Sequence, residues 1–152
     1  MSRAGAAHCT PADPAFAARV RASFARQPFM ATLGGLLTRV DPGEVEIELP
    51  FRDDLTQQHG YLHAGVVAAL ADTACGYAAF SLMPADAAVL SVEFKLNLLA
   101  PARGERFAAR ARVVRAGRTL TVTAADVFAI DGGTETIVAT MLGTMISRLR
   151  KD

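Results

Sequence analysis

The chain has 152 residues, of which 51% are hydrophobic and 20% are charged, and its formal net charge is +1. This length and composition predict a globular chain with one core and exclude a disordered protein. The balanced charge excludes a strong general attraction to nucleic acid or to an anionic membrane. Cys9 lies near a loose terminus and Cys75 in an apolar segment, so we expect no disulfide between them. The N-terminus lacks the apolar core of a signal peptide, and we therefore expect a cytoplasmic protein.

The first predicted elements are a short helix and a hairpin. Residues 14–26 predict an amphipathic helix, because Phe16, Val20 and Phe24 recur at a spacing of four. Residues 36–40 and 44–49 predict a β-hairpin across an Asp-Pro-Gly turn.

A long apolar helix follows a polar, glycine-containing turn over residues 57–65. Residues 64–83 are about as long as a membrane span. They are rich in alanine, however, contain Asp72 and two glycines, and lack basic or tryptophan anchors. We therefore expect a helix that is buried on nearly all sides of a soluble core and no association with a membrane.

The remaining segments predict strands. In residues 88–99 the apolar side chains alternate with polar ones, which indicates a strand buried on one face. Residues 106–115, 119–130 and 136–148 predict further strands, and tight turns between successive strands favour antiparallel neighbours. One sheet with one helix across it is an α+β layer architecture. The last strand is apolar on both faces, which suggests a second buried surface against another subunit.

Asp72 and the start of the long helix are the candidate chemical groups. An ionised carboxylate in an apolar helix costs free energy unless it has a partner or a function. The helix start presents free backbone N–H groups and the positive pole of the helix dipole. An acid and a group that polarises an electrophile are the two parts that an acyl-transfer site needs.

The order of these motifs resembles the hotdog-fold acyl-CoA thioesterases of the phenylacetate-pathway (PaaI) and 4-hydroxybenzoyl-CoA thioesterase type. In that family an amide residue, a short loop and His-Gly-Gly precede a helix that bears Asp or Glu nine positions after the His. The matching residues in this chain are Gln57, His63-Ala64-Gly65 and Asp72, followed by Ser91-Val92-Glu93-Phe94, Leu99-Ala100-Pro101-Ala102 and Gly117-Arg118-Thr119-Leu120. The resemblance implies a hotdog fold, with an antiparallel sheet wrapped around one long helix and a short helix before it. It divides the chain into an N-terminal extension with that short helix (1–28) and a hotdog thioesterase domain (29–150).

The resemblance also implies a function, which is hydrolysis of an acyl-CoA thioester to free acid and CoA. No cofactor is implied, because CoA is part of the substrate. The Ala64 N–H would bind the carbonyl oxygen, and Asp72 would activate water or attack the thioester directly. Gln57 and His63 would position the substrate or order the loop. Gly65, Thr73 and Ser91 would contact substrate or water.

Two residues depart from the family pattern. Ala64 occupies the position of the first family glycine, but a backbone N–H contact survives that exchange. Gln57 occupies a position where Asn is common, and its amide extends about one methylene further out.

The helix geometry bears on the oligomeric state. Nine residues of helix separate His63 from Asp72 by about 13.5 Å of rise and half a turn of rotation. The two positions of one chain therefore cannot meet at a single thioester carbon. If both are catalytic, different subunits supply them, and the resemblance implies the same arrangement. We expect a homodimer, assembled further as a dimer of dimers.

Other functions remain open at this point. Six arginines gather over residues 103–118, and Arg115 and Arg118 in a turn are the candidates for the CoA phosphates. Phe107 is the only aromatic residue in this stretch, which is too few for base stacking and argues against nucleic-acid binding. His59 and His63 have a metal-like spacing, but no further ligand completes a set, so we expect no metal. A hotdog hydratase or dehydratase and a non-catalytic acyl-CoA sensor are the alternative functions. The acyl group itself cannot be identified from the sequence.

Overall fold

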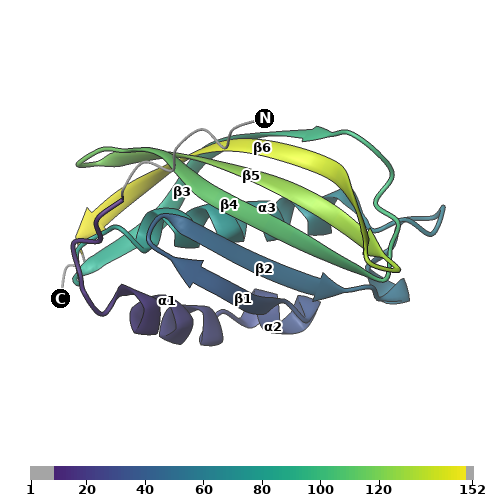
Figure 1. Ribbon diagram of the computed structural model, residues 1–152, viewed down its shortest axis with the longest axis horizontal. Helices are drawn as coiled ribbons and strands as arrows, with labels where there is room; N and C mark the ends of the chain where they lie inside the picture. The colour runs from purple at the N-terminus through teal and green to yellow at the C-terminus, as the bar shows by residue number, and fades with distance from the viewer. Residues whose placement is uncertain (1–8, 150–152) are drawn as a thin grey trace.

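The computed structural model describes residues 9–149, and they form one curved antiparallel sheet around one long helix (Figure 1). The sheet has six strands in the order β1-β2-β4-β5-β6-β3. The strands are β1 (Leu36–Asp41), β2 (Glu44–Pro50), β3 (Ala87–Leu98), β4 (Arg106–Ala116), β5 (Leu120–Asp131) and β6 (Thr134–Leu149). The helices are α1 (Phe16–Ala25), α2 (Pro28–Leu33) and α3 (Ala64–Phe80), with a short 3-10 helix, η1 (Asp53–Leu55). This arrangement confirms the α+β hotdog fold that the sequence predicts.

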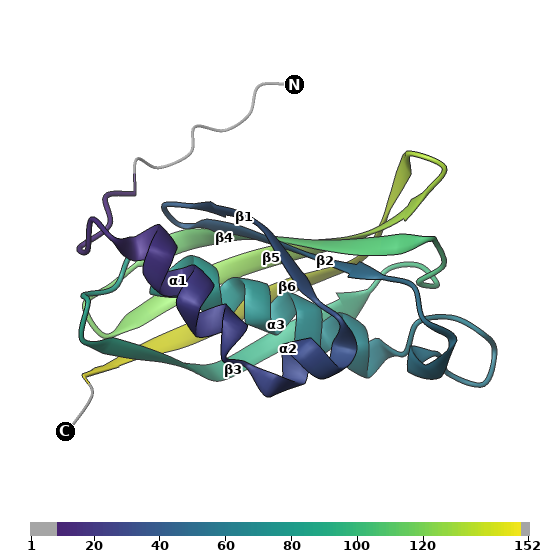
Figure 2. The same ribbon diagram turned by 90° about the horizontal axis from the view of Figure 1, so that it is seen from below.

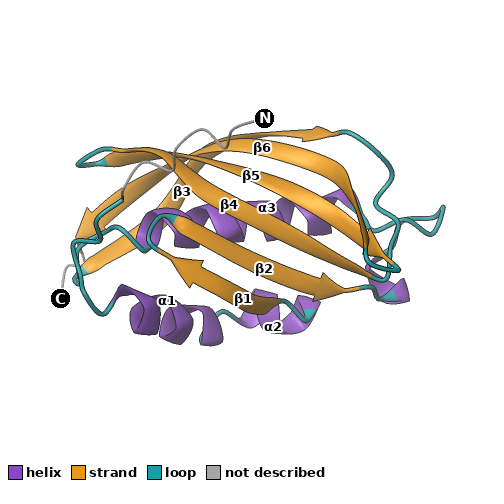
Figure 3. Cartoon of the chain, in the orientation of Figure 1, coloured by secondary structure: helices purple, strands orange, loops and turns teal. Residues whose placement is uncertain are grey.

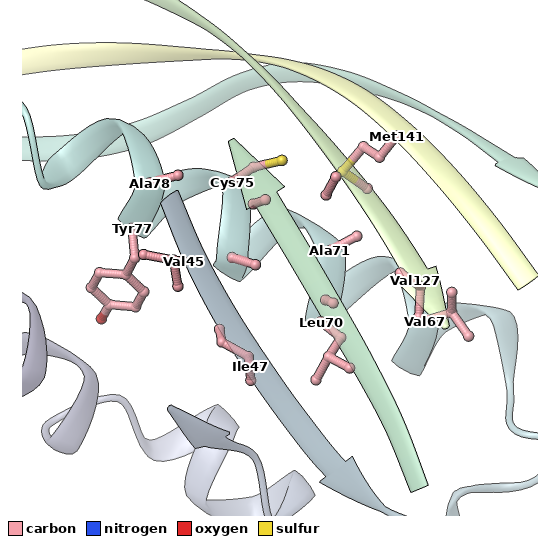
Figure 4. Close-up of a cluster of buried hydrophobic side chains, with 14 of the residues drawn as sticks. Val45, Ile47, Val67, Leu70, Ala71, Cys75, Tyr77, Ala78, Val127 and Met141 are labelled. Carbon is pink, nitrogen blue, oxygen red and sulfur yellow. The ribbon is translucent and has the colours of Figure 1, made fainter. Parts of the chain in front are cut away.

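The core lies between α3 and the concave face of the sheet (Figure 4). Alanines line both sides of this contact, including Ala71, Ala74 and Ala78 on α3 and Ala109 and Ala125 on the sheet. Their small side chains let the helix lie close to the curved sheet. Larger side chains fill the remaining space, and full burial of such a side chain stabilises the fold by roughly 1.5–3 kcal/mol. They include Leu70, Val67, Ile47, Val127 and Met141.

The sheet corrects the expectation that β3 and β4 are neighbours. β3 pairs with β6 and forms one edge of the sheet. The loop between β3 and β4 is not a hairpin, because it passes the N-terminal end of α3. There the Ala102 carbonyl accepts a hydrogen bond from Leu62 N at 3.0 Å, and Leu99 N donates to Val138 O at 2.8 Å. These loop bonds separate the two strands.

β3 also corrects the expectation of a strand buried on one face. Its apolar side chains are largely exposed in the single chain: Val92 is 54%, Phe94 44% and Leu98 56% exposed. The cause is the position of β3 at the sheet edge, where only one side has a neighbouring strand. A long, apolar edge strand is a surface that proteins ordinarily cover.

α3 is buried on nearly all sides, as expected, and one stripe along it is only partly covered. Its residues Val66, Ala69, Asp72, Thr73 and Gly76 are only half-buried. These positions recur at spacings of three and four, so they lie on one face of the helix. The sheet covers the opposite face, and the open stripe carries Asp72.

α1 lies beside β1 and α3, and α2 follows beside α1 (Figure 2). α2, which the sequence analysis did not predict, begins at Pro28 and ends before Gly34 in the left-handed conformation (Figure 3). The boundary predicted between residues 28 and 29 falls within α2. Residues 1–8 of the first predicted segment and residue 150 of the second lie outside the described residues. Within residues 9–149, no helix is long and apolar enough to cross a membrane.

Candidate active site

The start of α3 presents one free backbone N–H group. His63 is the N-cap, and its Nδ1 accepts a hydrogen bond from Gly65 N at 2.8 Å. The amides of Val66 and Val67 donate to the His63 carbonyl oxygen. The N–H of Ala64 has no acceptor within residues 9–149. It therefore points out of the helix start with the positive pole of the helix dipole behind it.

Glycine at position 65 makes this cap possible. A Cβ added there would lie 3.0 Å from Nδ1 of His63, which is closer than side chains normally approach. Gly65 thus allows the His63 ring to fold back over the first turn. The ring satisfies one helix amide, and the neighbouring Ala64 amide is left available.

Gln57 lies beside this helix start. Gln57 and Ala64 line the same pocket of about 500 Å³, whose other walls include Leu98, Leu99 and Val138. We call it the helix-start pocket. The Gln57 side-chain oxygen accepts a hydrogen bond from His59 N, and the Gln57 carbonyl accepts one from Gly60 N at 2.9 Å. These bonds join the side chain and the backbone of Gln57 to the loop before α3.

The Asp72 carboxylate is held by a serine from β3. Ser91 Oγ donates a hydrogen bond to Asp72 Oδ1 at 2.7 Å, and the same hydroxyl lies 3.4 Å from Met145 Sδ. The bond leaves Oδ2 of Asp72 available to another donor. Thr73 follows Asp72 and lines the same cavity as Asp72, which is described below. Among the described residues, Thr73 makes no hydrogen bond to Asp72.

Asp72 opens onto a second cavity, of about 280 Å³, which we call the Asp72 pocket. One wall is the open stripe of α3, and another is the beginning of β3 with Val89 and Ser91. A third wall comes from the N-terminal segment through Arg19, Ser23 and Gln27.

Sequence reasoning missed these three residues of the N-terminal segment as part of the site. Arg19 and Ser23 are four residues apart and form a polar stripe on one face of the predicted helix, and Gln27 continues their spacing one residue beyond its end. That stripe was a usable signal, but the sequence does not say which other element it contacts.

The two pockets are separate in one chain, since no residue lines both. Ala64 and Asp72 are eight residues apart on α3, which corresponds to about 12 Å of rise. The structure therefore gathers Gln57, His63, Ala64 and Gly65 at one end of the helix. Asp72, Thr73 and Ser91 form a second group further along.

Arg115 and Arg118 lie away from the helix-start pocket of their own chain. They flank the β4–β5 hairpin, where Thr119 O accepts a hydrogen bond from Ser147 N near the end of β6. β3 begins beside that end of β6, whereas the helix-start pocket lies where β3 ends. Both arginines are exposed, and neither forms an ion pair with a described residue.

Cys75 takes no part in this chemistry. It is buried under the sheet, and burial raises the pKa of its thiol to about 11. The thiol is therefore neutral near pH 7, and a neutral thiol is a poor nucleophile.

Comparison with known proteins identifies the family. A model of the Thioesterase superfamily matches residues 59–136, which is just over half of the chain. The solved structure of a thioesterase family protein from Silicibacter pomeroyi is 56% identical in sequence. It superposes with a TM-score of 0.88 over 89% of this chain and 99% of that chain.

Two curated relatives have more distant sequences. A protein of Halobacterium salinarum named as an esterase is 35% identical over 98 residues, which is 61% of this chain and 64% of that protein. The chain therefore spans less than two thirds of that relative. The 1,4-dihydroxy-2-naphthoyl-CoA hydrolase of Listeria monocytogenes is 29% identical over 91 residues, which is 60% of this chain and 74% of that protein. The family match and the close structural relative confirm the resemblance inferred from the motifs, and the chain belongs to the thioesterase superfamily.

Proposed function

We propose that this protein hydrolyses an acyl-CoA or aryl-CoA thioester to the free acid and CoA, at a site shared between two subunits. The observation that carries the proposal is the Asp72 carboxylate. It is oriented by Ser91 at 2.7 Å and opens onto a pocket in an otherwise apolar helix. The thioesterase superfamily match and the hydrolase name of the Listeria relative support the reaction class.

The free Ala64 amide supplies the second part of the chemistry. As the tetrahedral intermediate forms, negative charge develops on the thioester oxygen. An unpartnered N–H at a helix start stabilises that charge without reorganisation, because both the donor and the helix dipole are already oriented toward it.

Asp72 acts on the thioester carbon by one of two routes. As a general base, it takes a proton from water while the water oxygen bonds to the carbon, and the C–S bond then breaks with the proton passing to sulfur. As a nucleophile, it forms a mixed anhydride while the C–S bond breaks and CoA leaves as its thiolate. Water then hydrolyses that anhydride to the free acid and regenerates the Asp72 carboxylate, and the proton that water releases passes to the thiolate. Both routes need only water and the thioester, so the proposed reaction requires no cofactor.

A second copy of the chain brings the two parts together. Ser91 lies beside Asp72, and Leu98 lines the helix-start pocket, seven residues further along β3. If two β3 strands pair antiparallel about a two-fold axis near Phe94 or Lys95, position 91 of one chain lies opposite the segment around position 98 of its partner. Such pairing would cover the exposed edge strand and join the Asp72 pocket of one subunit to the helix-start pocket of the other.

The CoA nucleotide would extend out of this shared site. We assign its phosphates to Arg115 and Arg118, two exposed guanidinium groups without an ion-pair partner in the described part of the chain. Their hairpin lies at the end of the sheet where β3 begins, which is the end near Asp72. Acyl-CoA occurs in the cytosol, so a cytoplasmic location is part of the proposal.

The test is release of free thiol from a panel of acyl-CoA and aryl-CoA thioesters, with the wild-type chain and the Asp72→Asn variant. Asparagine keeps the size of the side chain and its bond to Ser91 but removes the charge. Turnover should fall by roughly two to four orders of magnitude, with the melting temperature nearly unchanged. Near-normal hydrolysis by a folded Asp72→Asn protein would falsify the role of this carboxylate.

A further inference from the structure

The Asp72 pocket extends well beyond the carboxylate. Asp72, Thr73, Gly76, Tyr77 and Phe80 all line it, and their spacing places them on adjoining rows of one side of α3. From Asp72 to Tyr77 the helix rises about 7.5 Å. The volume of about 280 Å³ equals the liquid volume of roughly nine water molecules. A pocket of this size has room for a chemical group that extends away from the reacting carbon, rather than for the reacting carbon alone.

Gly76 is the feature of this wall that packing does not explain. Glycine in the interior of a helix is destabilising relative to alanine. Its φ is not positive, and a Cβ added at Gly76 would meet no heavy atom within 4 Å. Neither a special backbone conformation nor a close neighbour therefore requires glycine there. The missing side chain instead adds open space to the pocket, between Asp72 and Tyr77.

The far end of the pocket is polar. Ser23 Oγ and Tyr77 OH lie 3.2 Å apart and form a hydrogen bond. The Tyr77 ring is fixed edge-on by Phe24 at 5.8 Å and by Phe80 at 6.1 Å between ring centroids. Only one of the two hydroxyl protons is used in the bond between them. The other proton and several lone pairs remain for a polar group in the pocket.

Most donors of the neighbouring Arg19 are used by the fold, although its buried Nη1 has no hydrogen-bond partner among residues 9–149. Its Nε donates to Asp13 at 2.8 Å, its Nη2 donates to the carbonyl oxygens of Phe80 and Met83, and its guanidinium stacks on the Phe80 ring. Arg19 thus ties α1 to the end of α3 and holds Ser23 against Tyr77. The hydroxyl pair is a rigid end wall.

We propose that the acyl group of the substrate lies over Gly76 with its far end against the Ser23–Tyr77 hydroxyl pair. Gly76 then determines how large an acyl group is accepted, and the hydroxyl pair favours one with a hydrogen-bonding group at its far end. This inference rests on the proposed thioesterase function. It assigns part of the specificity to α1, which lies outside the residues that the family model matches.

The first test fills the space at Gly76. The variants Gly76→Ala and Gly76→Leu are compared with wild type on acetyl-CoA and hexanoyl-CoA. The ratio of kcat/KM for hexanoyl-CoA to that for acetyl-CoA should fall about tenfold or more in Gly76→Leu and less in Gly76→Ala. The Gly76→Ala melting temperature should rise, because alanine favours the helix.

The matched control adds the same bulk outside the pocket. Ala18 is exposed on α1 and does not line the Asp72 pocket, so Ala18→Leu should keep the wild-type ratio. A wild-type ratio in Gly76→Leu as well would overturn the assignment of Gly76.

The second test removes one hydroxyl from the end wall. Tyr77→Phe is assayed with hexanoyl-CoA and with ω-hydroxyhexanoyl-CoA, which differ only in the terminal hydroxyl. The preference for the hydroxylated substrate should fall by about three- to tenfold, the usual effect of one neutral hydrogen bond. An equal loss of kcat/KM on both substrates would mean that the hydroxyl pair supports the fold and does not bind the far end of the acyl group.

A binding measurement separates the inference from the proposed reaction. If wild type releases no thiol from any thioester, the proposed function fails. The affinity for a thioether analogue of hexanoyl-CoA, measured by calorimetry, still tests the pocket. Weaker binding by Gly76→Leu than by wild type and Ala18→Leu supports the inference, and equal binding by all three overturns it.

Discussion

Asp72 and Ser91 work as a pair, although the bond that joins them connects residues nineteen positions apart. The hydroxyl fixes one carboxylate oxygen, so the other oxygen keeps a defined direction into the pocket. Positioning of this kind affects a reaction strongly, because a misplaced catalytic group loses much of its effective concentration.

Removal of this bond should slow hydrolysis without abolishing it. Ser91→Ala leaves the carboxylate charged but free to rotate. We expect kcat/KM to fall about ten- to hundredfold, the range for a lost hydrogen bond to a charged group. Ser91→Thr keeps a hydroxyl at the position and should recover part of the activity. Equal rates for Ser91→Ala and wild type, measured by thiol release, would exclude a positioning role.

At the residue level the sequence predicted candidates but not their partners. Asp72 was recognisable as a carboxylate in an apolar helix, and Ala64 as an amide at a helix start. The contact between Asp72 and Ser91 was not, because it depends on which strand lies beside α3. The catalytic and substrate-binding assignments of these residues stay predictions, while the structure supplies their geometry.

Among the elements, the sheet carries a network of charges across three strands. Arg110 on β4 donates from Nε to Glu46 on β2 at 2.6 Å and binds Glu135 on β6 through both terminal nitrogens, at 2.8 and 2.5 Å. Its guanidinium also stacks on Phe128 at 4.7 Å. The acidic partners of this arginine come from distant segments, which is why the sequence shows an arginine-rich stretch with few acids.

The network should make stability depend on pH. Partial burial raises the pKa of Glu46, but hydrogen bonds from Arg110 and Thr38 outweigh it and lower the value. The hydrogen bond from Arg110 also lowers the pKa of Glu135. A carboxylate whose pKa is lowered by folding stabilises the folded state at pH values above its unfolded pKa, which is near 4.5. That contribution is lost as the pH falls through the pKa of the carboxylate in the folded state.

The variant Arg110→Met tests this dependence. It should destabilise the protein by about 1 kcal/mol at pH 7, since the network is partly exposed. Its difference from wild type should shrink as the pH of the denaturation experiment is lowered from 4.5, because both carboxylates become protonated in the folded protein only below that value. Arg39→Met is the control, because the Arg39 side chain is 51% exposed against 38% for Arg110 and should contribute less. A difference that does not change with pH would show that Arg110 acts through packing on Phe128.

The β4–β5 hairpin is the element that we assign to the CoA phosphates. Replacing Arg115 and Arg118 together with alanine should raise KM for acyl-CoA about tenfold while kcat stays close to wild type. A truncated thioester that lacks the nucleotide should show little change. If KM rises equally for both substrates, the arginines act on the fold or the acyl site and not on the phosphates.

The elements themselves were largely predictable, and their pairing was not. Period-two and helical patterns gave every strand within two residues of its observed bounds. α2 was missed because six residues are too few to show a period. β3 was expected beside β4 and lies beside β6, because strand order depends on long-range contacts that alternation does not encode.

At the scale of the whole molecule, the single chain has features that a second copy would complete. It has two separate pockets, an exposed apolar edge strand and an open stripe on its central helix. The convex face adds Leu90 and Leu120, which are exposed and both lie opposite Ile146 of β6, and the exposed Leu142 four residues away along β6. The edge strand suits the proposed dimer, and this second apolar patch suits the proposed further pairing of two dimers.

Subunit complementation tests the shared site directly. Asp72→Asn removes the carboxylate, and Ala64→Tyr blocks the helix start, so each homo-oligomer should be inactive. When the two proteins exchange subunits, each mixed dimer has one site with both defects and one site with neither, because each site takes its helix start and its carboxylate from different chains. Activity should therefore return, approaching one working site per mixed dimer. Thiol release after mixing measures this recovery, and mass spectrometry of the intact oligomers measures the exchange. Complete exchange with no recovered activity would show that each chain holds its own complete site.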